Sequence, residues 1–201
     1  PTREPEGNFS NSGNFFTQYT LGRRHPLNMA RKKVLKAVDL LIIDEVSMLR
    51  ADILDAIDYR MRSVKRNFDE PFGGVQVLMI GDLFQLPPIV KDYEWQLLNK
   101  FYKSMHFFEA QAIRQSGMVY LELDKIFRQK DEKFITILNH LRDNEANEED
   151  ISFLNSFYKT EEEIKNLQDT IIITTHNYKA EEHNQKELAA LKTKAYTFEA
   201  V

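Results

Sequence analysis

Cysteine is absent from this chain of 201 residues. Its absence excludes disulfides, zinc sites with thiolate ligands, iron–sulfur clusters and cysteine nucleophiles. Long apolar runs are absent as well, because the run from Leu40 to Ile43 is followed at once by Asp44 and Glu45. A membrane span needs about 20 apolar residues, and no secretory signal pattern is present. We therefore expect an intracellular, cytoplasmic protein without a membrane partner.

Glycine and proline are scarce, with 7 Gly and 6 Pro. This scarcity argues against a disordered, collagen-like or low-complexity chain. Hydrophobic residues make up 42% of the sequence and charged residues 29%, as in ordinary globular proteins. The length suits one large domain or two small ones.

The net charge of -4 is unevenly distributed. Residues 1–66 hold 12 Lys and Arg against 8 Asp and Glu, whereas residues 67–201 hold 15 against 23. Two interpretations of the basic first third remain open: contact with phosphate groups or a solvated surface. The basic residues fall into two groups, Arg23, Arg24, Arg31, Lys32, Lys33 and Lys36, followed by Arg60, Arg62, Lys65 and Arg66.

Hydrophobic patterns predict an α/β fold with a parallel sheet. A helix over 29–38 precedes an apolar strand over 40–43 of the kind that is buried on both faces. Apolar residues at helical spacing predict a helix over 51–66, and a second apolar strand follows over 75–80. Strand, helix and strand form a βαβ unit with a right-handed crossover.

Further along the chain the pattern is coarser. We expect two amphipathic helices, one containing Phe134 and Leu141 and one containing Ile151 and Tyr158. The other expected elements are a helix over 94–103, strands over 118–123 and 170–175, and a final helix capped by Asn177 and ending near Leu191.

Acidic residues follow both strands of the βαβ unit. Parallel neighbouring strands end at one edge of the sheet, so Asp44 and Glu45 should converge there with Asp82. In nucleotide hydrolysis, the first carboxylate of such an Asp-Glu pair holds Mg²⁺ and the second orients or deprotonates the attacking water. Gln85 would then report the terminal phosphate without adding charge. Acidic residues also commonly follow strands without a catalytic role, and Gln85 taken by itself is more typical of a polar loop residue than of a phosphate sensor.

Three segments together resemble the PIF-type DNA helicases of helicase superfamily one, relatives of RecD. LLIIDEVSM (Leu40 to Met48) is similar to the Walker B motif, and GDLFQLPPIV (Gly81 to Val90) to helicase motif III. The stretch between them, which includes PFGGVQ (Pro71 to Gln76), contains the signature that separates this group from other helicases. LELDKIFRQKDEKF (Leu121 to Phe134) resembles motif IV. The resemblance implies a RecA-like P-loop NTPase fold, with a parallel sheet flanked by helices.

The resemblance implies a role for each candidate residue, with ATP and Mg²⁺ as cofactors. Asp44 would coordinate Mg²⁺, Glu45 would activate water, and Gln85 would couple the phosphate state to the DNA channel. Arg128 would reach the γ-phosphate from a second RecA-like domain, and its alternative is a structural ion pair. A softer resemblance over 170–188 assigns DNA-phosphate contacts, or simple helix capping, to Thr175, His176 and Asn177.

The same resemblance divides the chain into three parts. Residues 1–28 match the position of an inserted wedge subdomain, residues 29–116 most of a first RecA-like domain, and residues 117–201 the start of a second. Three aromatic residues of the first part would stack on bases or form its own core: Phe9, Phe15 and Phe16.

The sequence departs from the family in lacking a P-loop, since no GxxxxGK followed by Ser or Thr occurs. The family's last motifs are absent too. We therefore expect a central fragment of an ATP-dependent DNA helicase that moves in the five-prime to three-prime direction on single-stranded DNA and unwinds duplexes. Its partners would be single-stranded DNA and duplex junctions, in a family associated with DNA repair and recombination, and the isolated fragment should be inactive.

Two other functions remain open from the sequence. A metal-dependent nuclease would use Asp44, Glu45 and Asp82 as metal ligands. A non-catalytic DNA-binding module that has lost its P-loop would retain the fold without the reaction.

Overall fold

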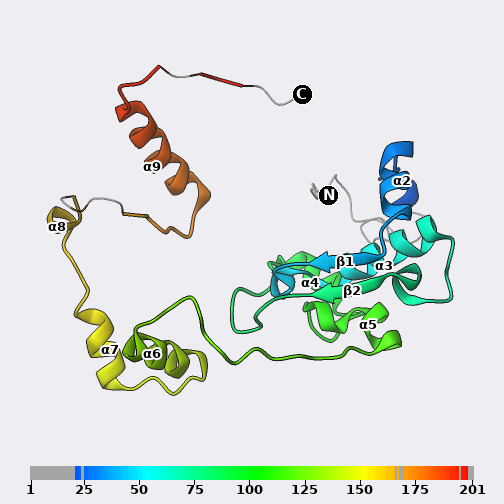
Figure 1. Cartoon of the computed structure of the whole chain (residues 1–201), viewed down its shortest axis with the longest axis horizontal. Coiled ribbons are helices and arrows are strands. Elements are labelled where there is room, and N and C mark those ends of the chain that lie inside the picture. The colour runs from blue at the N-terminus through cyan, green and yellow to red at the C-terminus, as the bar shows by residue number, and fades with distance from the viewer. Residues whose placement is uncertain (1–20, 24, 166, 168–169, 195, 199–201) are drawn as a thin grey trace. The chain divides into compact units, whose positions relative to one another are not determined.

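The computed structural model describes residues 21–201, apart from positions 24, 166, 168–169, 195 and 199–201 (Figure 1). The predictions for Phe9, Phe15 and Phe16 lie outside these described residues, as do most of those for residues 1–28. The chain divides into two compact units, Pro1–Arg128 and Gln129–Val201. No helix in the described part of the chain is long and apolar enough to cross a membrane.

The first unit is built on the predicted βαβ arrangement. β1 (Leu40–Ile43) and β2 (Gln76–Met79) pair in parallel, with Leu40 opposite Gln76 and Ile43 opposite Met79. α3 (Ala51–Lys65) connects them, and its buried residues include Leu54 and Met61, which recur at helical spacing. The sequence prediction of a strand, a helix and a second parallel strand is confirmed.

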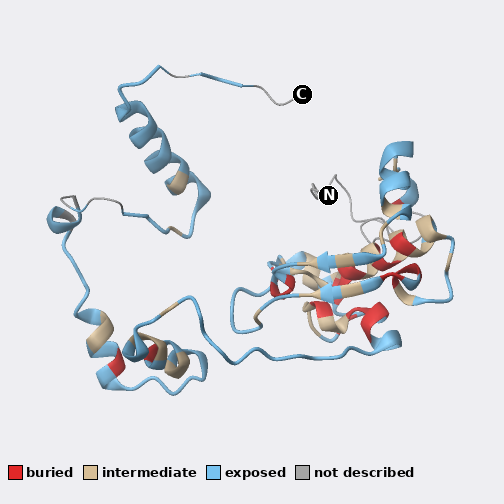
Figure 2. Cartoon of the chain, viewed as in Figure 1, coloured by how far each residue is buried: buried red, intermediate tan, exposed pale blue. Residues whose placement is uncertain are grey.

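One face of this sheet carries the core and the other is exposed. Leu41, Ile43, Val77 and Met79 pack against the core. The alternate side chains lie on the opposite face and are about half exposed: Leu40 46%, Ile42 55%, Leu78 46% and Ile80 48%. The expectation of strands buried on both faces is therefore wrong for the described residues, because helices cover only one face of the sheet (Figure 2).

Shorter helices surround this unit. α2 (Met29–Lys36) starts at Asn28, whose side chain accepts a hydrogen bond from the backbone N–H of Arg31 at 2.8 Å. After β2 come α4 (Asp92–Leu98), which is shorter than the helix expected over 94–103, and α5 (Gln111–Ser116). α2 and α4 are thus expected helices with shifted ends, whereas α5 was not predicted.

The second unit contains α6 (Glu132–Arg142), α7 (Glu148–Asn155), α8 (Glu161–Lys165) and α9 (Asn177–Ala190). The two amphipathic helices predicted for this region correspond to α6 and α7. The start of α7 is joined to α6 by a contact of 2.8 Å between His140 Nδ1 and Asp150 Oδ2.

Asp150 is the acidic member of a capping box at the start of α7. Its carboxylate accepts the backbone N–H of Asn147, and the side chain of Asn147 accepts the backbone N–H of Asp150. The N–H of Asn147, followed by the contact with His140, holds the pKa of Asp150 below its usual range.

Two predicted strands are not formed. Residues 118–123 and 170–175 have no regular secondary structure, and their β-branched residues are exposed, as Val119 and Ile173 illustrate. The only sheet among the described residues is the β1–β2 pair, and neither segment is a strand of it. β-propensity reflects packing against neighbouring strands, so without such neighbours it does not produce a strand. Asn177 is also not the cap of the last helix, because His176 occupies that position.

Two carboxylates of α3 attach it to the rest of the first unit. Asp55 accepts hydrogen bonds from the hydroxyl of Tyr102 at 2.7 Å and from the first backbone N–H groups of α5, those of Gln111 and Ala112. Burial, followed by the hydrogen bond to Asp55, raises the pKa of Tyr102.

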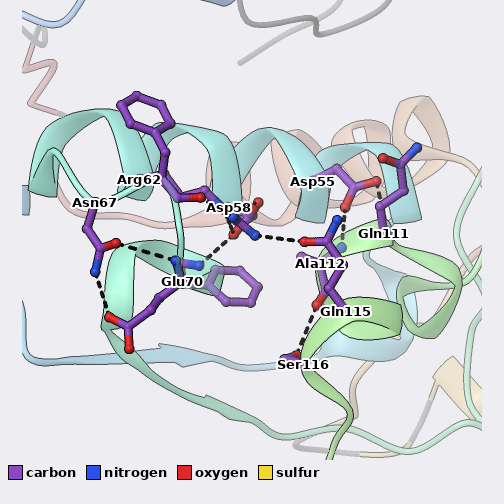
Figure 3. Close-up of polar contacts among 11 residues, drawn as sticks. Asp55, Asp58, Arg62, Asn67, Glu70, Gln111, Ala112, Gln115 and Ser116 are labelled. Carbon is purple, nitrogen blue, oxygen red and sulfur yellow. Dashed lines mark hydrogen bonds and ion pairs between the residues drawn. The ribbon is translucent and has the colours of Figure 1, made fainter.

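Asp58, one turn further along α3, holds the turn between α3 and β2 (Figure 3). Its carboxylate accepts the backbone N–H of Phe72 at 2.5 Å and the Nε–H of Arg62 at 2.9 Å. The guanidinium of Arg62 also donates to the carbonyl of Phe68 and to Gln115. The PFGG turn is thus held against α3 by the hydrogen bond from Phe72 to Asp58, whose carboxylate is itself paired with Arg62 within the helix.

We predict that Asp58→Asn lowers the free energy of unfolding by about 3 kcal/mol, because it leaves a largely buried guanidinium without its counter-charge. Urea unfolding followed by the fluorescence of Trp95, the single tryptophan, measures this change. The exposed Asp69 serves as the control through Asp69→Asn, which should change the stability by less than about 0.5 kcal/mol. Equal losses in the two variants would contradict the role of Asp58.

Candidate functional site

The carboxyl ends of β1 and β2 are joined by backbone hydrogen bonds that continue beyond the strands. The N–H of Ile80 donates to the carbonyl of Ile43 at 2.9 Å, and the N–H of Val46 donates to the carbonyl of Ile80 at 2.9 Å. The segment with Asp44 and Glu45 therefore lies directly beside the segment that leads to Asp82. The structure brings these segments together at one edge, as predicted from the parallel strands.

Glu45 lies in a left-handed backbone conformation, with φ 51° and ψ 42°. A non-glycine residue pays roughly 1 to 2 kcal/mol for this conformation. The turn is supported by Asp44, whose Oδ1 accepts the backbone N–H of Glu45 at 2.9 Å. Both side chains are exposed at the sheet edge. Such backbone strain concentrates at functional sites, which makes this turn the centre of the candidate site.

Gly81 is the point of closest approach between the two segments. A Cβ atom at this position would lie 3.0 Å from the backbone nitrogen of Val46 and 3.1 Å from that of Ser47. Val46 and Ser47 are buried, and the Oγ of Ser47 has no hydrogen-bond partner among the described residues. The two segments thus pack backbone against backbone, so a displacement of one must move the other.

Asp82 shapes the loop that carries Gln85. Its carboxylate accepts the backbone N–H of Phe84 at 2.9 Å and the side-chain amide of Gln85 at 3.3 Å. The N–H of Gln85 donates to the carbonyl of Asp82 at 3.1 Å, which closes a tight turn. Asp82 therefore positions Gln85, whose side chain is exposed on the same loop.

The far end of this loop is held by Arg50, which sequence reasoning missed. Its guanidinium donates to Glu94 at 2.9 Å and to Asp52 at 3.0 Å, and the side chain of Arg50 is only 11% exposed. Glu94 also accepts the backbone N–H of Lys91 at the start of α4. The signal available in the sequence was a basic residue just before α3, but its partner Glu94 lies 44 positions away.

The carboxylates suit Mg²⁺ held with a nucleotide better than a metal held by protein alone. No three metal-ligating side chains are gathered into one group within the described part of the chain. Asp44, Glu45 and Asp82, which the nuclease alternative needs as shared ligands, do not form such a group among the described residues. Mg²⁺ in nucleotide sites commonly uses one or two carboxylates together with substrate phosphates. Asp44 fits this, since only its Oδ1 accepts a hydrogen bond from the described residues.

The remaining predicted site residues lie elsewhere in the chain. Arg128 is exposed in an irregular stretch and is the last residue of the first unit. Thr175, His176 and Asn177 lie in the second unit, where Thr175 Oγ1 and His176 Nδ1 are 2.8 Å apart. His176 caps α9 without a side-chain hydrogen bond, so no side chain of the cap competes for the helix's first N–H groups.

Residues 24–152, well over half of the chain, match the family described as PIF1-like helicase. The chain belongs to the PIF1-like helicase family. Among its relatives, the ATP-dependent DNA helicase PIF1 of Saccharomyces cerevisiae is 34% identical over 173 residues. That match covers 82% of this chain and 18% of the yeast protein.

Solved structures of PIF1-like helicases show the same fold. A Bacteroides Pif1 helicase in complex with ADP–AlF3 and single-stranded DNA matches with a TM-score of 0.74 and 36% identity. The match covers 95% of this chain and 41% of the Bacteroides chain. A Pif1 helicase whose structure concerns the unwinding of forked duplex DNA by two coordinating Pif1 helicases matches with a TM-score of 0.73 and 40% identity. That match covers 81% of this chain and 38% of the other chain. This chain therefore spans less than half the length of each of these PIF1-like helicases.

We predict that Gly81→Ala forces apart the two segments of the PIF1-like site. Overpacking against backbone atoms should lower the free energy of unfolding by about 1 to 3 kcal/mol, measured by urea unfolding with Trp95 fluorescence. Gly22→Ala is the matched control, because a Cβ at Gly22 meets no atom of the described residues within 4 Å. If both variants keep the original stability, the close contact at Gly81 is not a constraint.

Proposed function

We propose that the chain is the central part of an ATP-dependent DNA helicase and carries the Mg²⁺-binding and water-activating residues of its ATPase site. The observation that carries this proposal is the backbone link between the segment of Asp44 and Glu45 and the segment that leads to Gln85. If ATP hydrolysis at Asp44 and Glu45 is to change the position of the loop that carries Gln85, the two segments must be physically connected. The family membership supports the reaction class.

Asp44 and Glu45 would divide the work at the end of β1. Asp44 would offer a carboxylate to Mg²⁺, which would supply positive charge to the phosphates of the nucleotide when it is bound. Glu45 orients the attacking water and accepts its proton. The left-handed turn at Glu45 turns the chain sharply directly after the strand, so the two carboxylates need not compete for one ligand.

Gln85 and Arg128 would complete the response to the γ-phosphate. Gln85 donates its amide to the terminal phosphate and exchanges its bond with Asp82 for that contact. Because Gly81 packs on Val46 and Ser47, a movement of this loop is passed to the Walker B turn. Arg128 stabilises the charge of the transferring phosphoryl group, a role that contributes about 10³ to 10⁵ in rate in related systems.

DNA would be bound by the second unit as well as by the loops of the first. Thr175, His176 and Asn177 lie at the start of α9, where N–H groups and the helix dipole favour phosphate. The relatives bound to single-stranded and forked DNA support this partner. On this proposal, residues 1–28 belong to a wedge subdomain, residues 29–116 to a first RecA-like domain and residues 117–201 to a second. The parent protein moves from five-prime to three-prime on single-stranded DNA and unwinds duplexes.

In the parent protein, which on this proposal also has a P-loop, we expect Glu45→Gln to abolish DNA-stimulated ATP hydrolysis while ATP binding is retained. The amide keeps the size of the side chain but cannot accept the proton of water. Phosphate release with and without single-stranded DNA, together with nucleotide binding, measures both effects. Asp39→Asn, at the amino end of β1, is the control and should hydrolyse ATP normally. An ATP hydrolysis rate that changes neither with single-stranded DNA nor with Glu45→Gln would refute the proposed mechanism.

The isolated chain of 201 residues should show little or no ATP hydrolysis. Without a P-loop lysine and its Ser or Thr, the β- and γ-phosphates lack most of their positive contacts. Phosphate release by the purified chain, at Mg²⁺ and ATP concentrations that saturate PIF1-like helicases, tests this expectation. Robust turnover that Glu45→Gln removes would show that these residues suffice for the reaction.

A further inference from the structure

A group of exposed cations lies on α2. This helix of eight residues carries four basic residues and no acidic residue, and none of its residues is buried. At 3.6 residues per turn, Lys32, Lys36 and Lys33 fall within an arc of about 100°. Leu35 is the residue of α2 that packs against the core, so this arc lies to one side of the packed position, and its three lysines are exposed.

The structure separates these cations from the other basic residues of the first third. Arg60 donates to the carbonyls of Leu21 and His25, and Arg62 is held by Asp58. By contrast, six exposed basic side chains of the first third form no hydrogen bond or ion pair with the described residues. One is Arg23, and we call the other five, which lie on or beside α2, the α2 basic surface: Arg31, Lys32, Lys33, Lys36 and Arg66.

Arg66 joins this surface because α3 ends beside α2. The ammonium of Lys65 donates to the carbonyl of Lys36 at 2.9 Å, which connects the last residues of the two helices. Arg66 follows directly as the C-cap of α3. The acidic residues nearest in sequence are few: Asp39, Asp69 and Glu70, of which Glu70 already accepts a hydrogen bond from Asn67.

The α2 basic surface lies at the opposite edge of the sheet from the ATPase residues. α2 precedes the start of β1, and the end of α3 precedes the start of β2, whereas Asp44 and Glu45 follow the end of β1. Figure 1 draws both strand arrows pointing away from α2. Four residues of parallel strand span roughly 10 Å or more. The basic surface is therefore separate from the nucleotide edge.

We propose that the α2 basic surface binds the phosphate backbone of duplex DNA, as a site distinct from the contacts at the start of α9. The inference rests on the proposed function only for the choice of DNA as the polyanion. The net charge of the chain is -4, so attraction to DNA must come from a local surface such as this one. α2 carries no aromatic residue for stacking on bases. Contact with phosphates alone suits a duplex, whose bases are covered, better than a single strand.

The test uses the 201-residue chain and a fluorescein-labelled duplex of about 20 base pairs with arbitrary sequence. Fluorescence anisotropy from roughly 50 to 200 mM salt gives the affinity and its salt dependence. One variant combines Lys32→Gln, Lys33→Gln and Lys36→Gln. The matched control combines Lys100→Gln, Lys103→Gln and Lys192→Gln, which remove the same charge from exposed positions elsewhere.

We expect the α2 variant to lose at least tenfold in affinity for the duplex, and its log–log salt slope to become shallower by about 2 to 3, since each lost phosphate contact removes nearly one unit. The control should change the slope by less than about 1. Circular dichroism and Trp95 unfolding confirm that both variants fold. Equal losses in the two variants, or no binding by the original chain at low salt, would overturn the proposal.

Two further probes separate the duplex from other partners. The first probe is a single-stranded oligonucleotide of equal charge. If the α2 variant loses more affinity for this single strand than for the duplex, the choice of duplex is overturned. Phosphatidylserine vesicles that lose binding in the α2 variant, while the duplex does not, would assign the surface to membranes instead. Failure of the proposed helicase is seen separately, as the absence of DNA-stimulated ATP hydrolysis in the parent protein.

Discussion

The parallel pairing of β1 with β2 is the constraint on which the rest of the first unit depends. The pairing continues past the strands through the bonds of Ile80 to Ile43 and of Val46 to Ile80. Because the strands are parallel, their ends meet at the same edge, and the acidic turn and the glutamine loop become neighbours. An antiparallel pair would have placed these segments at opposite ends of the sheet. The proposed chemistry therefore depends first on the parallel direction of the strands, which brings the two loops together, and only then on the side chains that the loops carry.

A parallel pair needs a crossover, and α3 does more than span it. Asp52, Asp55 and Asp58 recur every three residues, and each binds a different element: Arg50 before the helix, the start of α5, and the PFGG turn. The helical pattern of the sequence assigns these three acids no partner. Their partners lie in segments that only the folded chain brings near. The helix thus fixes both the entry to β2 and the segments that flank the sheet.

Elements specified by local pattern were predicted well, and those that depend on distant partners were not. A few consecutive residues are enough to recognise the apolar runs of β1 and β2 and the helical spacing of α3. The position of the acidic turn then follows from the end of β1. The segments 118–123 and 170–175 have strand-like composition but join no sheet among the described residues. The brace from Arg50 to Glu94 joins residues 44 positions apart, and the close contact at Gly81 depends on a backbone 35 positions earlier. Neither contact can be predicted from hydrophobic residues that recur every two residues, as in a strand, or every 3.6 residues, as in a helix.

The half-exposed face of the sheet has a consequence for how this chain behaves in solution. Leu40, Ile42, Leu78 and Ile80 line one side of the β1–β2 pair, and because the described residues form only these two strands, each strand is also an edge. Edge strands offer unpaired N–H and C=O groups to any extended segment they meet, and a neighbouring apolar surface strengthens the encounter. Self-association of the purified chain should therefore rise steeply with its concentration, and a solubilising fusion partner or a low working concentration would keep it dispersed.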